Sequence, residues 1–317
     1  MLHPQARALL DLMIERGVPP THTLSVADAR RFYLERRHTT QPVAPAIDEV
    51  RDLQAPGPLG DIPLRLYRHG AADGLRPALV FFHGGGWVIG DLDTHDTLCR
   101  QLAIASGCAV VSVDYRMGPE HPFPAATDDA CAATRWLAAQ AGSLGLDATR
   151  LAVGGDSAGG TLATVTALAA RDQGWPLALQ VLFYPGCAGH QSTPSHHTFS
   201  TGFLLEEAHI SYFFNQYLNH PQERDDWRFA PLDGVDETGS PRDLEGVAPA
   251  WIGLAECDPL VDEGVMYADR LRMHAVPVEL EIYAGVVHGF IQFGRAIPQA
   301  LSAHNDAARA LRHAFGG

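Results

Sequence analysis

Polar and apolar positions follow two different rhythms along the chain, and the change falls near residue 45. Over 6–16 and again over 25–37, apolar residues recur every three or four positions, a spacing that predicts two amphipathic helices. Ser25 stands where a side-chain N-cap of the second helix is expected. The Pro-containing stretch 39–45 then separates these helices from the remainder of the chain.

Beyond residue 46, short apolar runs alternate with longer segments of helical periodicity. Continuous apolar runs are typical of strands that are covered on both faces, so the alternation predicts an α/β fold with a mostly parallel sheet between two layers of helices. The predicted strands are 62–67, 78–82, 108–113, 151–153, 177–183, 250–254 and 278–283. The predicted helices of this part are 94–106, 125–139, 158–171, 262–274 and 298–315.

One long segment, 186–231, interrupts this alternation. It begins with a stretch rich in Ser, Thr and His, and a helix is predicted later in it, over 205–218. Long insertions at the carboxyl end of sheet strands usually cover a site. The predicted organisation is an N-terminal helical part (1–45), a first part of the core (46–185), an insertion (186–231) and a second part of the core (232–317).

The basic residues of the chain are all arginine. Lys and Arg together number 23, and the sequence contains no lysine. This excludes Schiff-base and pyridoxal-phosphate enzymes, P-loop NTPases, protein kinases and serine hydrolases of the S-x-x-K type, which all need a lysine. If a serine is the nucleophile here, a histidine is therefore expected to be its base.

Charge and cysteine content limit the binding partners and the cellular compartment that can be expected. The net charge of −14, without any basic run, argues against nucleic acid and membrane surfaces as partners. Five cysteines without C-x-x-C spacing indicate reduced thiols. No signal peptide or long apolar stretch is visible, which predicts a cytoplasmic location. The histidines of 190–197 lack the carboxylate or cysteine spacing of a metal site, so no metal is expected.

A candidate nucleophile lies in Gly155-Asp156-Ser157-Ala158-Gly159, which fits the G-x-S-x-G pattern. The motif follows a predicted strand and precedes a predicted helix. A sharp turn at this junction would hold the serine above the sheet, and a Cβ at either flanking glycine would clash with the neighbouring strand and helix. The beginning of the helix also directs free N–H groups toward the serine.

A second glycine-rich motif, His83-Gly84-Gly85-Gly86-Trp87, follows the buried strand 78–82. Three consecutive glycines allow the backbone to approach a ligand and to direct N–H groups toward it. An acyl-transfer enzyme needs such donors for the oxyanion of its tetrahedral intermediate. The predicted donors are the N–H groups of Gly85, Gly86 and Ala158. A loop that only packs closely, or one that binds phosphate, is the alternative.

The base and its orienting carboxylate are expected downstream of the serine. His288 follows the strand 278–283 and would lie at the carboxyl end of the sheet, whereas His69, His95, His209, His274, His304 and His313 are expected at the surface. Asp258 follows the strand 250–254 and is the favoured carboxylate, with Glu256 and Asp262 as rivals. The order Ser, Asp, His is that of α/β-hydrolases.

Taken together, these motifs resemble the hormone-sensitive-lipase-like (family IV) carboxylesterases of the α/β-hydrolase fold. The matching segments are 83–87, 115–126, 155–160, 258–260, 262–264 and 288–290. The resemblance implies Ser157 as nucleophile, His288 as base, Asp258 as orienting acid, and Gly85, Gly86 and Ala158 as the oxyanion hole. It also implies that the N-terminal part and the insertion form a cap over the pocket.

The function expected from this resemblance is hydrolysis of small-molecule esters with short- to medium-chain acyl groups. The reaction is expected to need no cofactor and no metal. Trp87, Phe203, Leu204 and Val287 are the candidates for contacting substrate, while the stretch 188–200 has no clear counterpart in the family. Members of the family are often dimers, so a homodimer is compatible with the resemblance. Amide, lactone or carbamate hydrolysis by the same residues stays open. A non-catalytic receptor on this fold is disfavoured because His288 stands in its motif.

Overall fold

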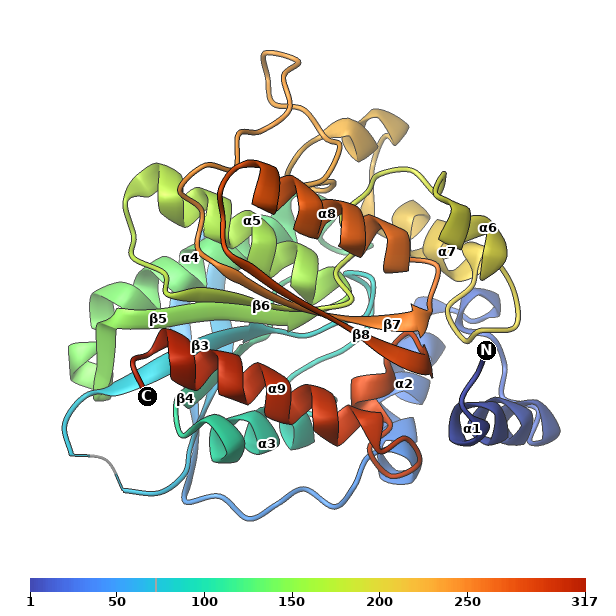
Figure 1. The fold of residues 1–317 in the computed structure, drawn as a ribbon, viewed down its shortest axis with the longest axis horizontal. Coiled ribbons are helices and arrows are strands. Elements are labelled where there is room, and N and C mark those ends of the chain that lie inside the picture. Colours follow the sequence, from blue (N-terminus) through green and yellow to red (C-terminus); the bar gives the residue numbers. More distant parts are fainter. Residues whose placement is uncertain (72) are drawn as a thin grey trace.

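The computed structural model describes residues 1–71 and 73–317 and contains one eight-stranded sheet (Figure 1). The strand order is β1-β2-β4-β3-β5-β6-β7-β8. The strands from β3 to β8 run parallel, whereas β1 and β2 form an antiparallel hairpin and β2 is antiparallel to β4. The strands are β1 (Glu49–Gly57), β2 (Gly60–Arg68), β3 (Arg76–Phe82), β4 (Ala109–Val113), β5 (Leu146–Asp156), β6 (Leu179–Phe183), β7 (Ala250–Cys257) and β8 (Val278–Val287).

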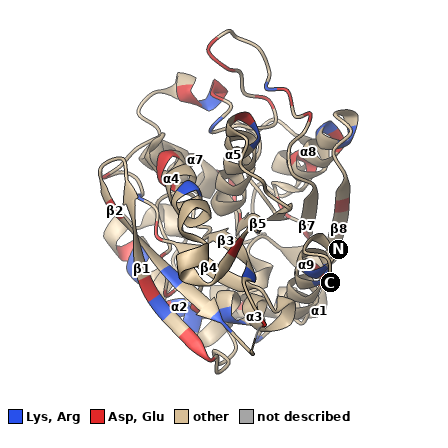
Figure 2. Ribbon diagram, turned by 90° about the vertical axis from the view of Figure 1, so that its left-hand side faces the viewer, with Lys and Arg blue, Asp and Glu red and all other residues tan. Residues whose placement is uncertain are grey.

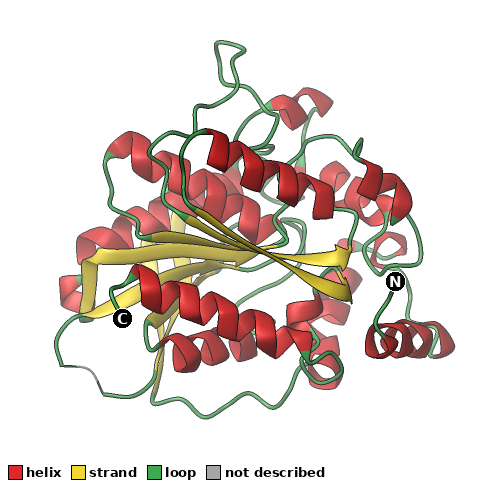
Figure 3. Ribbon diagram, in the orientation of Figure 1, coloured by secondary structure: helices red, strands yellow, loops and turns green. Residues whose placement is uncertain are grey.

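Helices cover both faces of this sheet (Figure 3). Helices α4, α5 and α8 lie on one face, and α3 and α9 pack together on the other (Figure 1). The α-helices are α1 (Pro4–Glu15), α2 (Val26–Thr40), α3 (Asp96–Ser106), α4 (Ala125–Gln140), α5 (Ala158–Gln173), α6 (Pro194–Thr198), α7 (Glu207–Tyr217), α8 (Val261–Met273) and α9 (Gln299–Ala314). Short 3-10 turns are η1 (Thr21–Thr23), η2 (Gly142–Leu144), η3 (Pro221–Asp225) and η4 (Phe290–Gln292). This layering confirms the predicted α/β class.

Apart from the short 3-10 turns, the structure adds β1 and α6 to the elements that the sequence predicts. Strand β1 buries only Ala55 among its side chains, so it carries no apolar run that would mark it as a strand. Figure 2 shows acidic and basic residues along β1, whereas the central strands are mostly uncharged. The five-residue helix α6 is too short for a periodic signal and begins with a capping box between Thr193 and His196.

Four helices gather at the end of the sheet where the parallel strands terminate. These end helices are α1 and α2 from the N-terminal part and α6 and α7 from the insertion (Figure 1). Ser25 caps α2 as predicted, since its hydroxyl accepts the N–H of Asp28 at 3.1 Å. The chain before α1 is anchored to the end of the sheet by the N–H of His3, which donates to the carbonyl oxygen of Gly285 at 2.8 Å.

The expected surface position of three histidines is wrong. His95, His209 and His304 are buried. Each lies on the inward face of a helix or directly before its first residue, and the apolar periodicity of the sequence locates this face only approximately. His304, for example, lies on the buried face of α9 and reaches the carbonyl oxygen of Ile291 at 3.1 Å. In the described part of the chain, no helix has both the length and the apolar character needed to span a bilayer.

Candidate active site

Ser157 occupies the turn between β5 and α5, and its backbone is strained. Its φ of 54° and ψ of −122° lie in a region that non-glycine residues rarely adopt. The flanking glycines permit this turn, as predicted: a Cβ on Gly155 would come within 2.4 Å of the Gly159 backbone, and one on Gly159 within 2.0 Å of the Phe82 carbonyl oxygen. The turn therefore holds the hydroxyl above the carboxyl edge of the sheet.

His288 lies between this hydroxyl and a buried carboxylate. Its Nε2 is 2.9 Å from Ser157 Oγ, and its Nδ1 is 2.7 Å from Asp258 Oδ2. Because an ionised carboxylate only accepts, Nδ1–H donates to Asp258, which leaves Nε2 free to accept the serine proton. The Asp258 side chain is fully buried, and its other oxygen accepts the N–H of Leu260 at 2.9 Å. The three side chains thus form one hydrogen-bonded chain, and each of them directly follows the end of a strand, β5, β7 or β8.

The two rival carboxylates are engaged elsewhere. Glu256 accepts the N–H of Gly285 at 2.6 Å, which fastens the end of β7 to β8. Asp262 accepts the N–H of Ser195 at 2.8 Å. Asp258 is therefore the carboxylate of this loop that the structure brings to His288.

The loop after β3 places further backbone donors beside the serine. Gly85 and Gly86 have φ values of 128° and 59°, conformations that favour glycine. The carbonyl oxygen of Gly85 accepts the N–H groups of Val88 and Ile89 at 3.1 and 3.0 Å, which closes the loop into a tight turn. Gly85, Gly86 and Ala158 line the same cavity as Ser157.

A buried carboxylate connects the serine turn to the glycine loop. Asp156 accepts the N–H of Gly84 at 2.8 Å and lies 3.1 Å from Nε2 of His95. Burial alone would raise the pKa of the Asp156 carboxyl, but His95, the Gly84 N–H and His83 together hold it below its usual range. The hydroxyl of Tyr115 donates to the carbonyl oxygen of His83 at 2.7 Å and fixes the same loop from the other side.

This network was not found from the sequence. Asp156 occupies a variable position of the G-x-S-x-G pattern, and His95 was expected at the surface. Burial also lowers the pKa of His83 to about 4, aided by the neighbouring His95, so that the His83 ring is neutral at physiological pH. The only available signal was that a charged residue directly precedes the candidate nucleophile.

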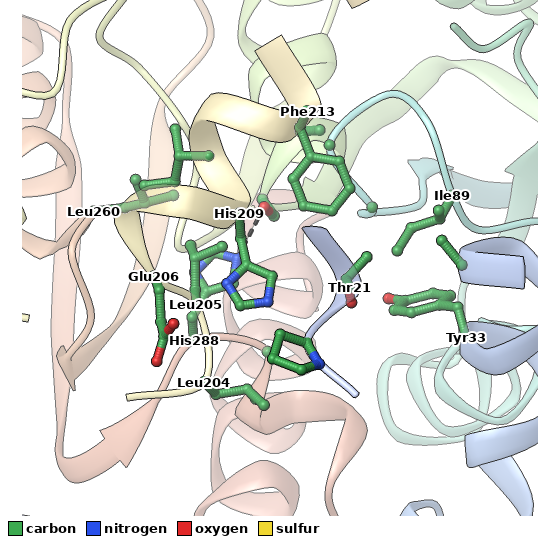
Figure 4. Close-up of a pocket in the computed structure, with 18 of the residues that line it drawn as sticks. Thr21, Tyr33, Ile89, Leu204, Leu205, Glu206, His209, Phe213, Leu260 and His288 are labelled. Carbon is green, nitrogen blue, oxygen red and sulfur yellow. Dashed lines mark hydrogen bonds between the residues drawn. The ribbon is translucent and has the colours of Figure 1, made fainter. Parts of the chain in front are cut away.

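A cavity of about 380 Å³ opens above Ser157 and His288. Figure 4 shows Tyr33 from α2, Phe213 from α7 and Ile89 from the loop after β3 around this space. Trp87 and Leu204 also line the cavity, whereas Phe203 and Val287 do not. Those two residues belong to a separate apolar cluster that includes Leu10 and Cys257. Among the described residues, no group of three His, Cys, Asp or Glu side chains is arranged to hold a metal ion.

Arg30 attaches α2 to the loops around the serine. It donates to the carbonyl oxygens of Val88 and Gly118 at 2.8 and 2.9 Å, and its two terminal nitrogens contact Glu120 at 2.9 and 2.7 Å. The segment that carries Val88 directly continues the glycine loop. Arg30 thus connects the N-terminal helices to the backbone of the site.

The insertion is attached through the stretch whose role the sequence left open. Ser195 donates from its hydroxyl to the carbonyl oxygen of Pro259 at 2.6 Å and from its N–H to Asp262. Both contacts lie within four residues of Asp258. Next to them, His196 Nε2 lies 3.6 Å from Glu263, a buried acid whose pKa burial raises well above its usual value. The stretch therefore docks α6 onto the loop of the site carboxylate.

Most of the chain is similar to known α/β-hydrolases and esterases. Residues 79–292 match a family model described as the alpha/beta hydrolase fold. An ethyl acetate hydrolase of Pseudomonas putida is 42% identical over 309 residues, which cover 94% of this chain and 95% of that protein. The esterase LipI of Mycobacterium tuberculosis is 41% identical, over 87% of this chain and 85% of its own length.

Solved structures extend the similarity to three dimensions. An ester hydrolase from the metagenome of Lake Arreo, complexed with a bipyridine phosphonate derivative, has a TM-score of 0.94 and 41% identity, with 100% of both chains covered. A hyperthermophilic esterase from Pyrobaculum calidifontis has a TM-score of 0.91 and 36% identity, with 98% of both chains covered.

Proposed function

The chain belongs to the hormone-sensitive-lipase-like carboxylesterases of the α/β-hydrolase fold and is a carboxylic ester hydrolase, and from this premise we propose how it acts and on which esters. Ser157 is the nucleophile, His288 the general base and Asp258 the orienting acid. Gly85, Gly86 and Ala158 supply the oxyanion hole. The substrates are small esters with short- to medium-chain acyl groups. The observation that carries the proposal is the continuous hydrogen-bonded chain from Ser157 through His288 to Asp258.

Acylation begins at the serine hydroxyl. Its proton moves to Nε2 of His288, 2.9 Å away, while Oγ attacks the carbonyl carbon of the ester. Asp258 keeps the imidazole in the tautomer that can accept this proton and stabilises the imidazolium that forms. The imidazolium then donates its proton to the departing alcohol, and an acyl group stays bound to Ser157.

Deacylation repeats these steps with water as the nucleophile. Nε2 of His288 accepts a proton from the water, whose oxygen attacks the acyl carbon. Collapse of the second tetrahedral intermediate returns the proton to Ser157 Oγ and releases the carboxylic acid. Each cycle consumes one water, and the enzyme groups regain their initial protonation states.

Backbone N–H groups stabilise the negative oxygen in both steps. In other acyl-transfer enzymes, loss of one such donor lowers kcat by about 10²–10³-fold. The donors act without reorganisation because the Gly84 N–H is held by Asp156 and the His83 carbonyl by Tyr115. Helix α5 adds its positive N-terminal end beside the serine.

The proposed acyl-chain preference rests on the size of the cavity. We assign residues 1–45 and 186–231 to a cap over the core, whose two parts are 46–185 and 232–317. Tyr33, Phe213 and Leu204 of this cap narrow a cavity of about 380 Å³, which is near the lower end of the range typical of small-ligand sites. A long acyl chain would have to leave this space.

The test is hydrolysis of p-nitrophenyl esters from acetate to palmitate by wild type and Ser157→Ala. The wild type should favour the shorter chains, and Ser157→Ala should lose at least about 10³-fold in kcat. Ser143→Ala, which changes an exposed serine of η2, is the matched control and should keep the wild-type rate. An unchanged rate in Ser157→Ala contradicts the nucleophile assignment, and a preference for palmitate over butyrate contradicts the chain-length proposal.

A further inference from the structure

Charged side chains that line the cavity differ in whether they are hydrogen-bonded to the protein backbone. Asp156, Glu206 and Glu263 line the cavity, and each accepts a backbone N–H, from Gly84, Gly202 and Cys187 respectively, at 2.8 Å. One arginine, Arg36, is found among the lining residues of the described chain. It is the cation that any substrate in this cavity would meet.

Helix α2 directs Arg36 toward the cavity. The residues of α2 that line the cavity are Ala29, Phe32, Tyr33, Arg36, Thr39 and Thr40. Their spacing of three or four positions places them on one face of the helix. Arg31, which does not line the cavity, is exposed and pairs with Asp28 at 2.8 Å. The two arginines thus belong to one helix but to different surroundings.

Two aromatic rings orient the Arg36 guanidinium. Its central carbon lies over the Tyr33 ring, 4.0 Å from the centroid, and 5.7 Å from the centroid of Phe293. A guanidinium stacked by its face keeps its N–H groups at its edge, in the plane where a carboxylate binds with two parallel hydrogen bonds. The contact with Tyr33 therefore positions the group and engages only part of its five N–H donors.

Apart from the Tyr33 side chain, with which the guanidinium also interacts, these donors have no carboxylate or carbonyl partner among the described residues. The neighbouring arginines of α2, Arg30, Arg31 and Arg37, each have a carboxylate within 4 Å, whereas the ion pairs of residues 1–71 and 73–317 do not include Arg36. None of its nitrogens is buried without a hydrogen bond either. The N–H edge is thus accessible from the cavity.

We propose that Arg36 binds a carboxylate carried by the substrate, so that this enzyme favours esters with a second, anionic group over uncharged esters of the same length. This inference rests on the proposed function, because it assigns a substrate class to the same site. The net charge of −14 acts against anions at long range. The preference must therefore come from direct contact with Arg36.

The experiment compares matched esters that differ in one carboxylate. In the first pair, monoethyl adipate carries a carboxylate on the acyl side and ethyl hexanoate lacks it. In the second pair, 4-acetoxybutanoate carries a carboxylate on the alcohol side and butyl acetate lacks it. For each pair, the ratio of kcat/KM for the anionic ester to that for the neutral ester is measured in wild type, Arg36→Met and Arg31→Met. Both variants remove one positive charge from α2, so they change the long-range field alike.

In Arg36→Met, this ratio should fall about tenfold or more in at least one pair, as expected when a charge-assisted hydrogen bond is lost. Arg36→Lys should keep part of the preference, since it retains the charge without the planar fork. Arg31→Met should keep the wild-type ratios. Ratios in Arg36→Met that equal those of wild type in both pairs overturn the inference, as does an equal fall in Arg31→Met.

Failure of the inference can be distinguished from failure of the proposed function. If wild type hydrolyses ethyl hexanoate and butyl acetate, Ser157→Ala does not, and the ratios are unaffected by Arg36→Met, only the role of Arg36 is refuted. If Ser157→Ala hydrolyses the neutral esters at the wild-type rate, the proposed nucleophile itself is refuted.

Discussion

The floor of the cavity and the proposed cap above it are constructed in different ways. The floor, made of the loops that carry Ser157, Gly84–Gly86, Asp258 and His288, consists of backbone held by buried polar contacts and by glycines whose replacement would cause clashes. The cap is made of short helices, of which α1 buries only Ala6 and Leu10 and α2 only Ala29. A few polar contacts, mainly those of Arg30 and Ser195, attach it to the floor.

This difference separates two tasks. In the proposed mechanism, the floor fixes atoms that must align within fractions of an ångström for proton transfer and oxyanion binding. The cap supplies most of the apolar walls, where a change of side chain alters the shape of the space rather than the reaction. Substitutions in the floor should therefore act on kcat, and substitutions in the cap should act on KM and on substrate choice.

The largest effect is expected from Asp258→Asn in the floor. The amide would favour the wrong tautomer of His288, so kcat should fall on the order of 10⁴-fold with little change in KM. Steady-state kinetics with p-nitrophenyl butyrate measures this loss. Glu256→Gln and Asp262→Asn are the controls and should lose less than about tenfold; near-full activity in Asp258→Asn would move the assignment to one of these rivals.

A smaller effect is expected from Asp156→Ala, which removes the acceptor of the Gly84 N–H. The glycine loop should then lose its fixed position, so kcat should fall by about 10- to 100-fold while KM changes little. Asp156→Asn, which keeps an acceptor oxygen, should recover part of the loss. Thermal unfolding of both variants shows whether they remain folded, and a folded Asp156→Ala with wild-type kcat would contradict the positioning role.

In the cap, Arg30→Met should affect KM more than kcat. Loss of the contacts to Val88, Gly118 and Glu120 loosens α2 over the cavity, and kcat/KM should fall by about three- to tenfold, mainly through KM. Arg31→Met, on the exposed side of the same helix, serves as control. A fall in kcat without a rise in KM would show that Arg30 acts like a residue of the floor, and would contradict the division of roles between floor and cap.

The smallest effect concerns the stability of the cap at low pH. His209 of α7 is buried and packs edge-on against His22 at 4.6 Å between ring centroids, and burial followed by the charge of His22 lowers its pKa to about 4. The unfolded chain therefore binds this proton first as pH falls. The stabilisation is fully present above pH ~6.5 and is lost progressively down to pH ~4.

Urea unfolding at pH 8 and pH 5.5 measures this loss. The free energy of unfolding of wild type should decrease by about 1 kcal/mol more than that of His209→Phe, which keeps a ring but does not titrate. Equal decreases in the two proteins would show that His209 does not contribute to the acid sensitivity.

The sequence was sufficient for the parts of the floor that lie next to strand ends. A glycine-flanked serine, a histidine after the last strand and an aspartate before a proline are local signals, and the carboxyl ends of parallel strands meet at one edge. The partners of Asp156 could not be predicted, because Gly84 approaches it only through the pairing of β3 with β5, and His95 only through the packing of α3 on the neighbouring β4. The same holds for β1, which is held by pairing with β2 along an almost fully exposed face.

The cap was the least predictable region in detail. The two longer helices of the N-terminal part and α7 follow from periodicity, but their inward faces do not. Phe203 was expected to touch substrate and instead packs beside Phe199 at 4.9 Å between ring centroids, whereas Arg36 and His209 line the cavity without any local signal. Which side of a cap helix faces the site depends on a few contacts distant in sequence.

The N-terminal helices have a further consequence for how the protein is made. Their contacts reach far forward along the chain: the Gln41 side chain donates to Gln292, 251 positions later, and the N–H of Arg295 donates to the carbonyl oxygen of Thr40. At about 5–20 residues per second, the ribosome delivers these partners roughly 10 to 50 s after α2 emerges. Helix α2 thus makes these contacts only after the chain that follows β8 has been synthesised.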